Sequence, residues 1–350
     1  RGYGQDFAER CFSQIEGFGT YGFPESHAAS FAILVYASAW IKCHHPEIFL
    51  AALLNSQPMG FYAPAQLVRD ARAHGVQVLP VDVNHSHWDA VLERQKDGRL
   101  AVRLGFRSVK GVGNGPAAMI VAARHAPYRS VDDLWRRSGV PVHQIERLAE
   151  ADGFGSLGLV RRQALWAIRA LDDEPLPLFA AAAARDDDIF AEPAVALRPM
   201  TAGGEVSEDY ATMGLTLRAH PLSFIRGQLA ARRFRALSDL AHMRNGQKVR
   251  IAGLVLIRQR PGSSKGVIFI TLEDEHATAN LVIWPTLFEP FRAEIMAARL
   301  LGVEGRVQRE GAIIHVVVER LVDLSPLLSE IGAANHTERA TLEVRSRDFH

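Results

Sequence analysis

Cysteine is scarce in this sequence, which has two, Cys11 and Cys43, among 350 residues. Two thiols cannot complete a zinc cluster of cysteines, and they fall far short of a disulfide framework. The scarcity therefore excludes the small disulfide-stapled classes and predicts a protein of the reducing cytoplasm.

Long apolar segments are also missing. The longest runs from Ala28 to Ile41, includes Ser30 and Tyr36, and stops at Lys42, which is short of the roughly 18 residues that a membrane span needs. No charged-then-apolar leader precedes it. We expect a soluble protein with no membrane partner. The sequence opens on Arg1 rather than Met, which indicates a piece of a longer chain.

An excess of charge of one sign is missing as well. Forty Lys and Arg against 39 Asp and Glu give a formal net charge of +1, so composition indicates neither a polycation nor a disordered polyanion. Locally the balance differs, because residues 99–170 hold 12 basic against 5 acidic side chains and residues 171–210 hold 2 against 10. This pattern predicts a basic domain followed by an acidic connector.

The periodicity of apolar residues predicts a helical first half and an all-β end. Residues 1–90 carry apolar side chains at helical spacing, with breaks at residues 58–60 and at Gly75. From Gln247 onward the period is two, in five short strand candidates with a helical pattern before the fourth. Five strands interrupted in this way fit a closed barrel of the oligonucleotide-binding (OB) type. The expected fold class is α+β and multidomain.

The most specific local signal lies at residues 109–120, VKGVGNGPAAMI. Two glycines around one small apolar residue are typical of a tight hairpin, and a helix that opens near Pro116 presents free backbone N–H groups. Such a turn holds a DNA phosphate without reading bases, and Lys110 would add a positive charge. The predicted DNA-binding residues are Lys110, Gly111, Val112, Gly113 and Asn114. This pattern resembles the helix-hairpin-helix motif.

A second, degenerate copy occupies residues 148–158, LAEADGFGSLG. Gly153 and Gly155 would form its turn, and Arg161 follows, so these three residues are also predicted to bind DNA. Glu150 and Asp152 beside the turn would repel a phosphate. For both copies the alternative interpretation is a glycine turn that joins two packed helices.

Basic side chains in the first barrel strand and the loop after it predict a track for a single-stranded backbone. The predicted contacts are Lys248, Arg250, Arg258, Arg260 and Lys265. Phe269 or Trp284 could stack on a base, and both could instead belong to the core. For Trp284, in an apolar strand, the core is the favoured interpretation.

Near the start, residues 19–31 read GTYGFPESHAASF. A glycine-bounded aromatic loop runs into a helix whose first turn carries Ser26 and His27. This arrangement suits the base and phosphates of a nucleotide, and an ordinary capped helix has the same composition. Spacing does not decide between the two.

Longer stretches resemble a known family. Residues 21–32 (YGFPESHAASFA) and 40–49 (WIKCHHPEIF) resemble the end of the fingers domain of the bacterial C-family DNA polymerases, the DNA polymerase III alpha type. Residues 55–62 (NSQPMGFY) and 81–84 (VDVN) are more similar to the error-prone branch than to the replicative one. The resemblance covers nearly the whole chain, and the ending SRDFH looks like the natural C-terminus of that branch.

The resemblance implies an order of domains. It places the C-terminal part of the fingers at 1–95 and a tandem helix-hairpin-helix domain at 96–171. An acidic connector with a helical linker follows at 172–240, then the OB barrel at 241–326 and a flexible tail at 327–350. The connector, with its alanine run and Gly203-Gly204, is expected to be poorly ordered through residue 210.

The resemblance also implies an activity, damage-induced translesion synthesis on primer-template DNA from dNTP substrates. In the family, palm-domain aspartates hold two Mg²⁺ ions, and none of them matches this chain. We therefore expect this segment to be inactive alone and to supply part of the nucleotide pocket and the DNA grip. Tyr21 and His27 match fingers positions near the incoming nucleotide, with loop packing and helix capping as the alternatives.

By the same resemblance, the expected partners are an inactive Y-family-like protein and, directly or through it, the sliding clamp. Residues 175–179, PLPLF, have the apolar end of a clamp-binding peptide and lack its leading glutamine. Two other functions stay open: the replicative alpha subunit of the same family, and a non-enzymatic module of hairpins and barrel. The second leaves residues 21–49 without an explanation.

Overall fold

The computed structural model describes residues 4–20, 24–60, 62–171, 197–311, 313–332 and 347–349. These residues form three hydrophobic cores. One belongs to a helical body, one to a β-barrel and one to a small helical block. No helix in the described parts of the chain is long and apolar enough to cross a membrane.

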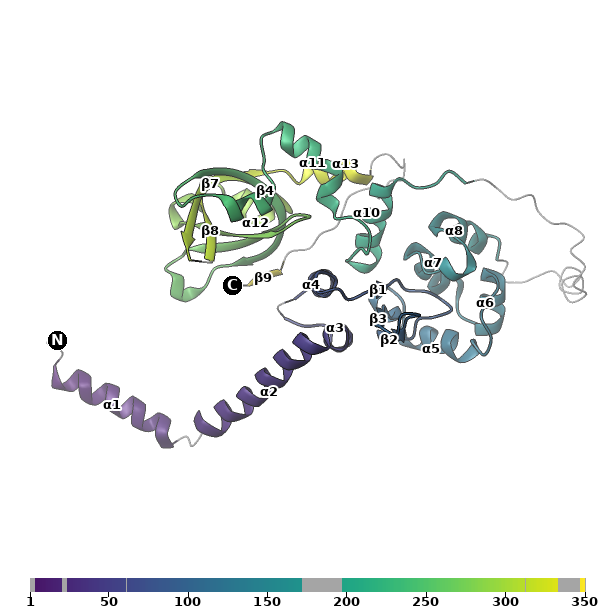
Figure 1. Ribbon diagram of the computed structural model, residues 1–350, viewed down its shortest axis with the longest axis horizontal. Coiled ribbons are helices and arrows are strands. Elements are labelled where there is room, and N and C mark those ends of the chain that lie inside the picture. The colour runs from purple at the N-terminus through teal and green to yellow at the C-terminus, as the bar shows by residue number, and fades with distance from the viewer. Residues whose placement is uncertain are drawn as a thin grey trace, which may run out of the picture.

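The chain begins with four helices: α1 (Gln5–Thr20), α2 (Pro24–His44), α3 (Pro46–Asn55) and α4 (Pro64–Ala73). Proline stands at the first position of α3 and α4, where its missing N–H group costs no helical hydrogen bond. Figure 1 shows α1 and α2 as an arm that extends away from the rest of the chain. The α2 side chains of Ile33, Leu34 and Tyr36 are 61–74% exposed.

A small sheet follows, of strands β1 (Val78–Leu79), β2 (Val91–Arg94) and β3 (Leu100–Arg103) in the order β1-β3-β2. Strand β1 is parallel to β3, and β2 is antiparallel to it. The sequence did not predict the β2–β3 hairpin, because β2 is half-exposed. The predicted domain boundary between residues 95 and 96 falls within its turn. One core runs across that boundary, from Leu50 through Val102 to Ile168.

Four short helices complete the helical body: α5 (Asn114–Ala123), α6 (Val131–Ser138), α7 (Val142–Glu150) and α8 (Arg161–Arg169). Their inward side chains Ile120, Leu134, Ile145 and Leu148 are fully buried. The turn between α5 and α6 is closed by Ser130, whose hydroxyl accepts a hydrogen bond from the Asp133 amide. The packing of these helices fixes the two glycine turns.

The helical block consists of α10 (Ala202–Met213), α11 (Pro221–Ala231) and α13 (Pro326–Gly332), and it lies between barrel and body in Figure 1. A Cβ atom at Gly203 would lie 2.3 Å from the Ile331 carbonyl oxygen, so the glycine allows α10 and α13 to cross closely. Residues 202–210 are therefore helical, not poorly ordered, and residues 327–332 are a packed helix rather than a flexible tail.

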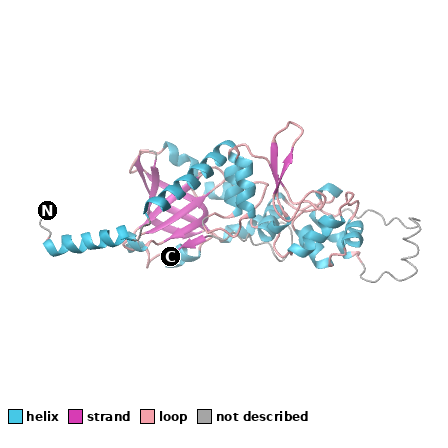
Figure 2. Cartoon of the chain, turned by 90° about the horizontal axis from the view of Figure 1, so that it is seen from below, coloured by secondary structure: helices cyan, strands magenta, loops and turns pink. Residues whose placement is uncertain are grey.

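The barrel is built from β4 (Lys248–Gln259), β5 (Ile268–Glu273), β6 (Thr278–Ile283), β7 (Leu300–Glu310) and β8 (Ile313–Asp323). The sheet order is β5-β6-β8-β7-β4, and β4 pairs with β5 to close it. Helix α12 (Arg292–Ala297) stands before the fourth strand, so the expected OB-type barrel is confirmed. Figure 2 shows its crossing strands.

The end of the chain adds one more strand. Strand β9 (Arg347–Phe349) pairs in parallel with residues 257–259 of β4, on the edge that β7 leaves free beyond Leu254. The expectation of a flexible tail is thus corrected for these three residues too, because backbone hydrogen bonding fixes them to the barrel.

Candidate nucleic-acid interface

The first hairpin, residues 109–113, is a tight turn in front of α5. Gly111 has φ +86°, a conformation that favours glycine. Val112, between the glycines, is buried and anchors the turn in the core. Helix α5 begins directly after Gly113, and its exposed Asn114 lies in the first turn, where the amide groups have no partner within the helix. The geometry expected from the sequence is therefore present.

A glutamine that the sequence analysis missed holds this turn. The Gln144 side chain, from α7, accepts a hydrogen bond from the Gly113 amide at 2.9 Å and donates one to the Gly111 carbonyl at 3.0 Å. Gln144 therefore fixes both sides of the hairpin. No sequence signal reveals it, because 31 residues separate it from Gly113.

Lys110 is bonded to helix α10. Its ammonium group donates hydrogen bonds to the carbonyl oxygens of Tyr210 and Ala211, at 3.1 and 2.7 Å, and its own amide donates to the Thr212 carbonyl at 2.9 Å. These groups belong to the last turn of α10, where the helix dipole favours a cation. Lys110 thus joins the hairpin to α10, and its contact with a phosphate stays a prediction.

The second hairpin, residues 148–158, is closed by an acidic side chain of the protein itself. The Ser156 amide donates a hydrogen bond to the Asp82 carboxylate at 2.8 Å, and the Gly153 carbonyl accepts one from the Val83 amide at 2.9 Å. The same carboxylate lies 3.7 Å from the position that a Cβ atom at Gly155 would take. A carboxylate occupies the place where a phosphate would bind, which favours the structural interpretation of this copy.

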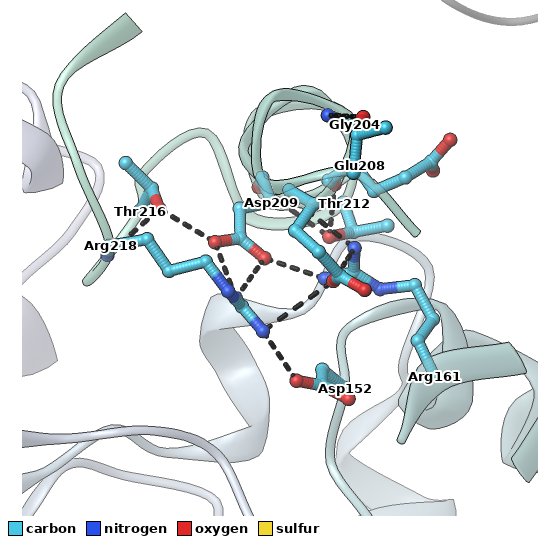
Figure 3. Close-up of polar contacts among 10 residues, drawn as sticks. Asp152, Arg161, Gly204, Glu208, Asp209, Thr212, Thr216 and Arg218 are labelled. Atoms are coloured by element: carbon cyan, nitrogen blue, oxygen red, sulfur yellow. Dashed lines mark hydrogen bonds and ion pairs between the residues drawn. The ribbon is translucent and has the colours of Figure 1, made fainter. Parts of the chain in front are cut away.

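Arg161 is buried, and this corrects its prediction as a DNA ligand. Its side chain is 2% exposed and pairs with Glu205 at 2.7 Å and with Asp209 at 2.6 Å. Arg218 binds the same Asp209 carboxylate and reaches Asp152 at 2.6 Å, as Figure 3 shows. Burial raises the pKa of Glu205, against the opposing effect of the two arginines. The network joins α8 to α10 and leaves Arg161 no access to DNA.

In the barrel, Arg258 is likewise internal. It is 7% exposed, and its guanidinium donates to the carbonyl oxygens of Ile295, at 2.7 Å, and Ala298, at the end of α12. Arg258 therefore stabilises α12 and is corrected as a DNA contact. Arg250 pairs with Glu304 at 3.1 Å and lies over the Phe234 ring, whereas Lys248 is exposed at the start of β4.

A basic-aromatic cluster forms at one end of the barrel. The guanidinium of Arg260 lies 4.9 Å from the centre of the Phe288 ring, and that of Arg292 lies 5.6 Å from it. Lys265 is exposed and precedes Gly266. A Cβ atom built at Gly266 would lie 3.5 Å from Pro285, so this loop lies next to the segment that follows β6. The members of the cluster are Arg260, Lys265, Trp284, Phe288 and Arg292. The sequence analysis missed Phe288 and Arg292, which only the fold brings to this loop.

Two aromatic predictions in the barrel have different outcomes. Trp284 is 52% exposed, so the favoured assignment to the core is wrong: the strand ends at Ile283, one residue earlier. Phe269 lies between the buried Ile268 and Ile270 of β5, so its side chain is on the outer face of the barrel and half-buried. Base stacking by Phe269 stays a prediction.

The residues predicted to contact the nucleotide and the sliding clamp lie mostly outside the described residues. Tyr21 and residues 175–179 lie outside the described residues, and for His27 only its place in the first turn of α2 is described. Within the parts of the chain that the structure covers, no three His, Cys, Asp or Glu side chains gather as metal ligands. The described residues therefore offer no cluster that fits a Mg²⁺ site.

Known domain families match both units of the interface. Residues 75–164 match the helix-hairpin-helix motif, and residues 249–324 match the OB-fold nucleic acid binding domain. The fold and the interface thus define a nucleic-acid-binding class of protein. Among solved structures, asparaginyl-tRNA synthetase from Pyrococcus horikoshii is 24% identical over 26% of this chain and 22% of its own, with a TM-score of 0.23, which is too slight a likeness for any argument.

The relatives narrow this class. Error-prone DNA polymerase 1 of Agrobacterium fabrum is 58% identical over 96% of this chain and 32% of its own length, and error-prone DNA polymerase 2 of that species is 59% identical over 93% and 30%. The error-prone DNA polymerase of Brucella abortus is 51% identical over 100% and 34%. Over nearly its whole length the chain is therefore similar to error-prone DNA polymerases, and it spans about a third of the length of these relatives.

Proposed function

We propose that this chain is the DNA-gripping segment of an error-prone DNA polymerase that acts in damage-induced translesion synthesis. The whole enzyme would extend a primer with dNTPs, using Mg²⁺ bound by carboxylates outside this chain, in the cytoplasm. The segment by itself would have no polymerase activity. Its relatives' names and its two nucleic-acid-binding domains support this proposal.

One observation carries the proposal, which is the geometry of the first hairpin. Gly111 has the positive φ that the turn requires, and Asn114 and Gly115 are exposed at the start of α5. A backbone of this shape binds phosphate oxygens independently of base sequence. A polymerase needs such a grip, because it must hold every duplex that it makes.

The two units would divide the DNA between them. The first hairpin would bind phosphates of the duplex behind the primer end, and the basic-aromatic cluster would hold the single-stranded template ahead of it. Arg260 and Arg292 supply charge, and the exposed Trp284 supplies a surface on which a base can stack. An inactive Y-family-like protein and the sliding clamp are the further partners that we propose.

Replacement of Gly113 tests whether the first hairpin binds duplex DNA. A Cβ atom at Gly113 would lie 3.2 Å from Pro116 and 4.0 Å from the Gln144 amide oxygen, so Gly113→Val disturbs the turn. We expect it to weaken duplex binding by this chain uniformly across DNA sequences. The slope of log affinity against log salt concentration should become less steep by about 0.9 for each phosphate that the variant no longer binds.

The matched control is Gly227→Val, because Gly227 lies in α11 with nothing within 4 Å of its Cβ position. Both variants are compared with the parent by fluorescence anisotropy on labelled duplexes of different sequence. Equal affinity and equal salt slope for Gly113→Val and the parent would overturn the proposed grip.

A further inference from the structure

Arg147 lies against the first hairpin, on the helix that holds the turn. Gln144 and Arg147 are three residues apart on α7, so their side chains share one helix face. Gln144 bonds the two glycines of the turn. The Cδ and Nε atoms of Arg147 lie 3.4 and 3.5 Å from the position that a Cβ atom at Gly111 would take. The side chain of Arg147 is thereby positioned over the hairpin.

The charge of Arg147 is paired with a neighbour on the same helix. Its guanidinium pairs with the Glu150 carboxylate at 2.7 Å, one turn along α7, and the two side chains are 47% and 27% exposed. A pair so open to water is weak, because solvent screens it. Arg147 can therefore leave Glu150 for a stronger anionic partner.

Lys110, the cation within the hairpin itself, is exposed too, but its partners are backbone groups of another helix. Its ammonium group is bonded to two carbonyl oxygens at the end of α10. To meet a phosphate at the turn, Lys110 would have to release the last turn of that helix. Arg147, by contrast, is a cation on α7 whose side chain lies against Gly111 of the hairpin.

We propose that Arg147 supplies the charged contact to the DNA phosphate bound at the first hairpin, and that Glu150 weakens this contact by competing for the same guanidinium group. This inference rests on the proposed function, since it takes the hairpin as the site of the phosphate. An arginine suits the task because its planar guanidinium matches two phosphate oxygens at once.

The proposal predicts changes of opposite sign for the two partners. Removing one phosphate contact flattens the slope of log affinity against log salt by about 0.9. If variant and parent bind equally at 1 M salt, the variant then binds roughly eightfold more weakly at 0.1 M. We expect this from Arg147→Ala. We expect Glu150→Gln to tighten duplex binding by roughly two- to fivefold, the factor that an exposed ion pair contributes. In the double variant, the gain from Glu150→Gln should vanish.

The chain offers a matched pair as control. Arg136 and Asp132 form the same kind of exposed pair on α6, at 2.9 Å with side chains 55% and 48% exposed. Arg136→Ala and Asp132→Asn change the net charge equally and lie on another helix. All variants are titrated with a fluorescein-labelled primer-template duplex at several salt concentrations, and thermal unfolding confirms that each is folded. Arg147→Gln replaces Arg147→Ala if the latter unfolds.

The outcomes separate this inference from the proposed function. The inference fails if Arg147→Ala costs no more affinity than Arg136→Ala, or if Glu150→Gln tightens binding equally with and without Arg147. If Gly113→Val weakens binding while the Arg147 variants do not, the hairpin binds DNA without this arginine. If none of these variants changes binding, the proposed grip itself is overturned.

Discussion

At the scale of single residues, burial decides which arginines a ligand can reach. Arg161 and Arg258 are 2% and 7% exposed and bind carboxylate and carbonyl groups of the protein itself. Arg260, two residues after Arg258, is exposed and lies over an aromatic ring. The sequence predicted all three as DNA contacts, because the residue type alone does not reveal whether an arginine is buried or exposed. Only the packing distinguishes a structural cation from an available one.

Trp284 offers a direct test of the barrel surface. We expect Trp284→Ala to lower the affinity for a single-stranded oligonucleotide by about 1–3 kcal/mol, because a base can no longer stack on the indole. Quenching of tryptophan fluorescence by the oligonucleotide should decrease with it. The control is Trp166→Ala on α8, a side chain 50% exposed against 52% for Trp284. Equal decreases in the two variants would contradict a specific role for Trp284.

The pair of Glu93 and Arg103 predicts a contribution to acid stability. Two hydrogen bonds from Arg103, at 2.8 and 2.9 Å, lower the pKa of the Glu93 carboxyl below its ordinary value of 4.5. An acid whose pKa is lower in the folded state stabilises the fold above its ordinary pKa, and this stabilisation is lost as pH falls through the lowered value.

Glu93→Gln should therefore reduce the free energy of unfolding at pH 7 more than at pH 3. Urea denaturation across this pH range measures the difference between variant and parent. A difference that is constant with pH would show that the carboxylate charge contributes nothing. Glu319→Gln, in the exposed pair of Glu319 with Arg306 at 2.8 Å, is the control.

At the scale of elements, the crossing of α10 and α13 depends on one small residue. Gly203→Ala would place a Cβ atom 2.3 Å from the Ile331 carbonyl oxygen, which is backbone and cannot turn aside. We expect a decrease of about 1–3 kcal/mol in the free energy of unfolding, as overpacking commonly costs. Gly227→Ala, with open space around it, should instead stabilise α11 by about 0.5–1 kcal/mol. Thermal unfolding of the two variants gives the signs.

The elements that the sequence predicted are those with a strong local pattern. The Gly111–Gly113 turn and the period of two after Gln247 depend only on neighbouring residues, and both are present. Helix α13 could not be predicted, because its burial comes from α10, more than a hundred residues earlier. The same holds for the candidate interface. The glycines of the turn could be recognised in the sequence, whereas the tertiary fold alone brings Gln144 to the first hairpin and Phe288 to the basic-aromatic cluster.

At the scale of the whole molecule, a buried carboxylate joins the barrel to its neighbours. Glu273 of β5 pairs with Arg69 of α4 at 2.9 Å and lies 3.3 Å from His220, which caps α11. Next to it, a cleft of about 740 Å³ lies between helices α2 to α4 and the barrel, with Leu53 and Leu256 in its lining. Glu273 is therefore a direct contact between the helical body and the barrel.

Glu273→Gln should loosen this contact without unfolding either part. We expect a decrease of about 1–3 kcal/mol in stability, between the values typical of an exposed and of a buried ion pair, and a larger radius of gyration in small-angle X-ray scattering. The comparison is Glu304→Gln, whose pair with Arg250 lies within the barrel. An unchanged radius for Glu273→Gln would show that other contacts hold the two parts together.

Helix α10 links the helical body to α13, the helix that follows strand β8 of the barrel. Near its C-terminal end, the Ala211 carbonyl accepts a hydrogen bond from Lys110 of the first hairpin. Earlier in the helix, Asp209 binds Arg161 of the helical body. On its other side it packs on α13, which continues directly from the last barrel strand. Under the proposed function, a force on a single strand held by the barrel would therefore reach the hairpin that would hold the duplex through α13 and α10.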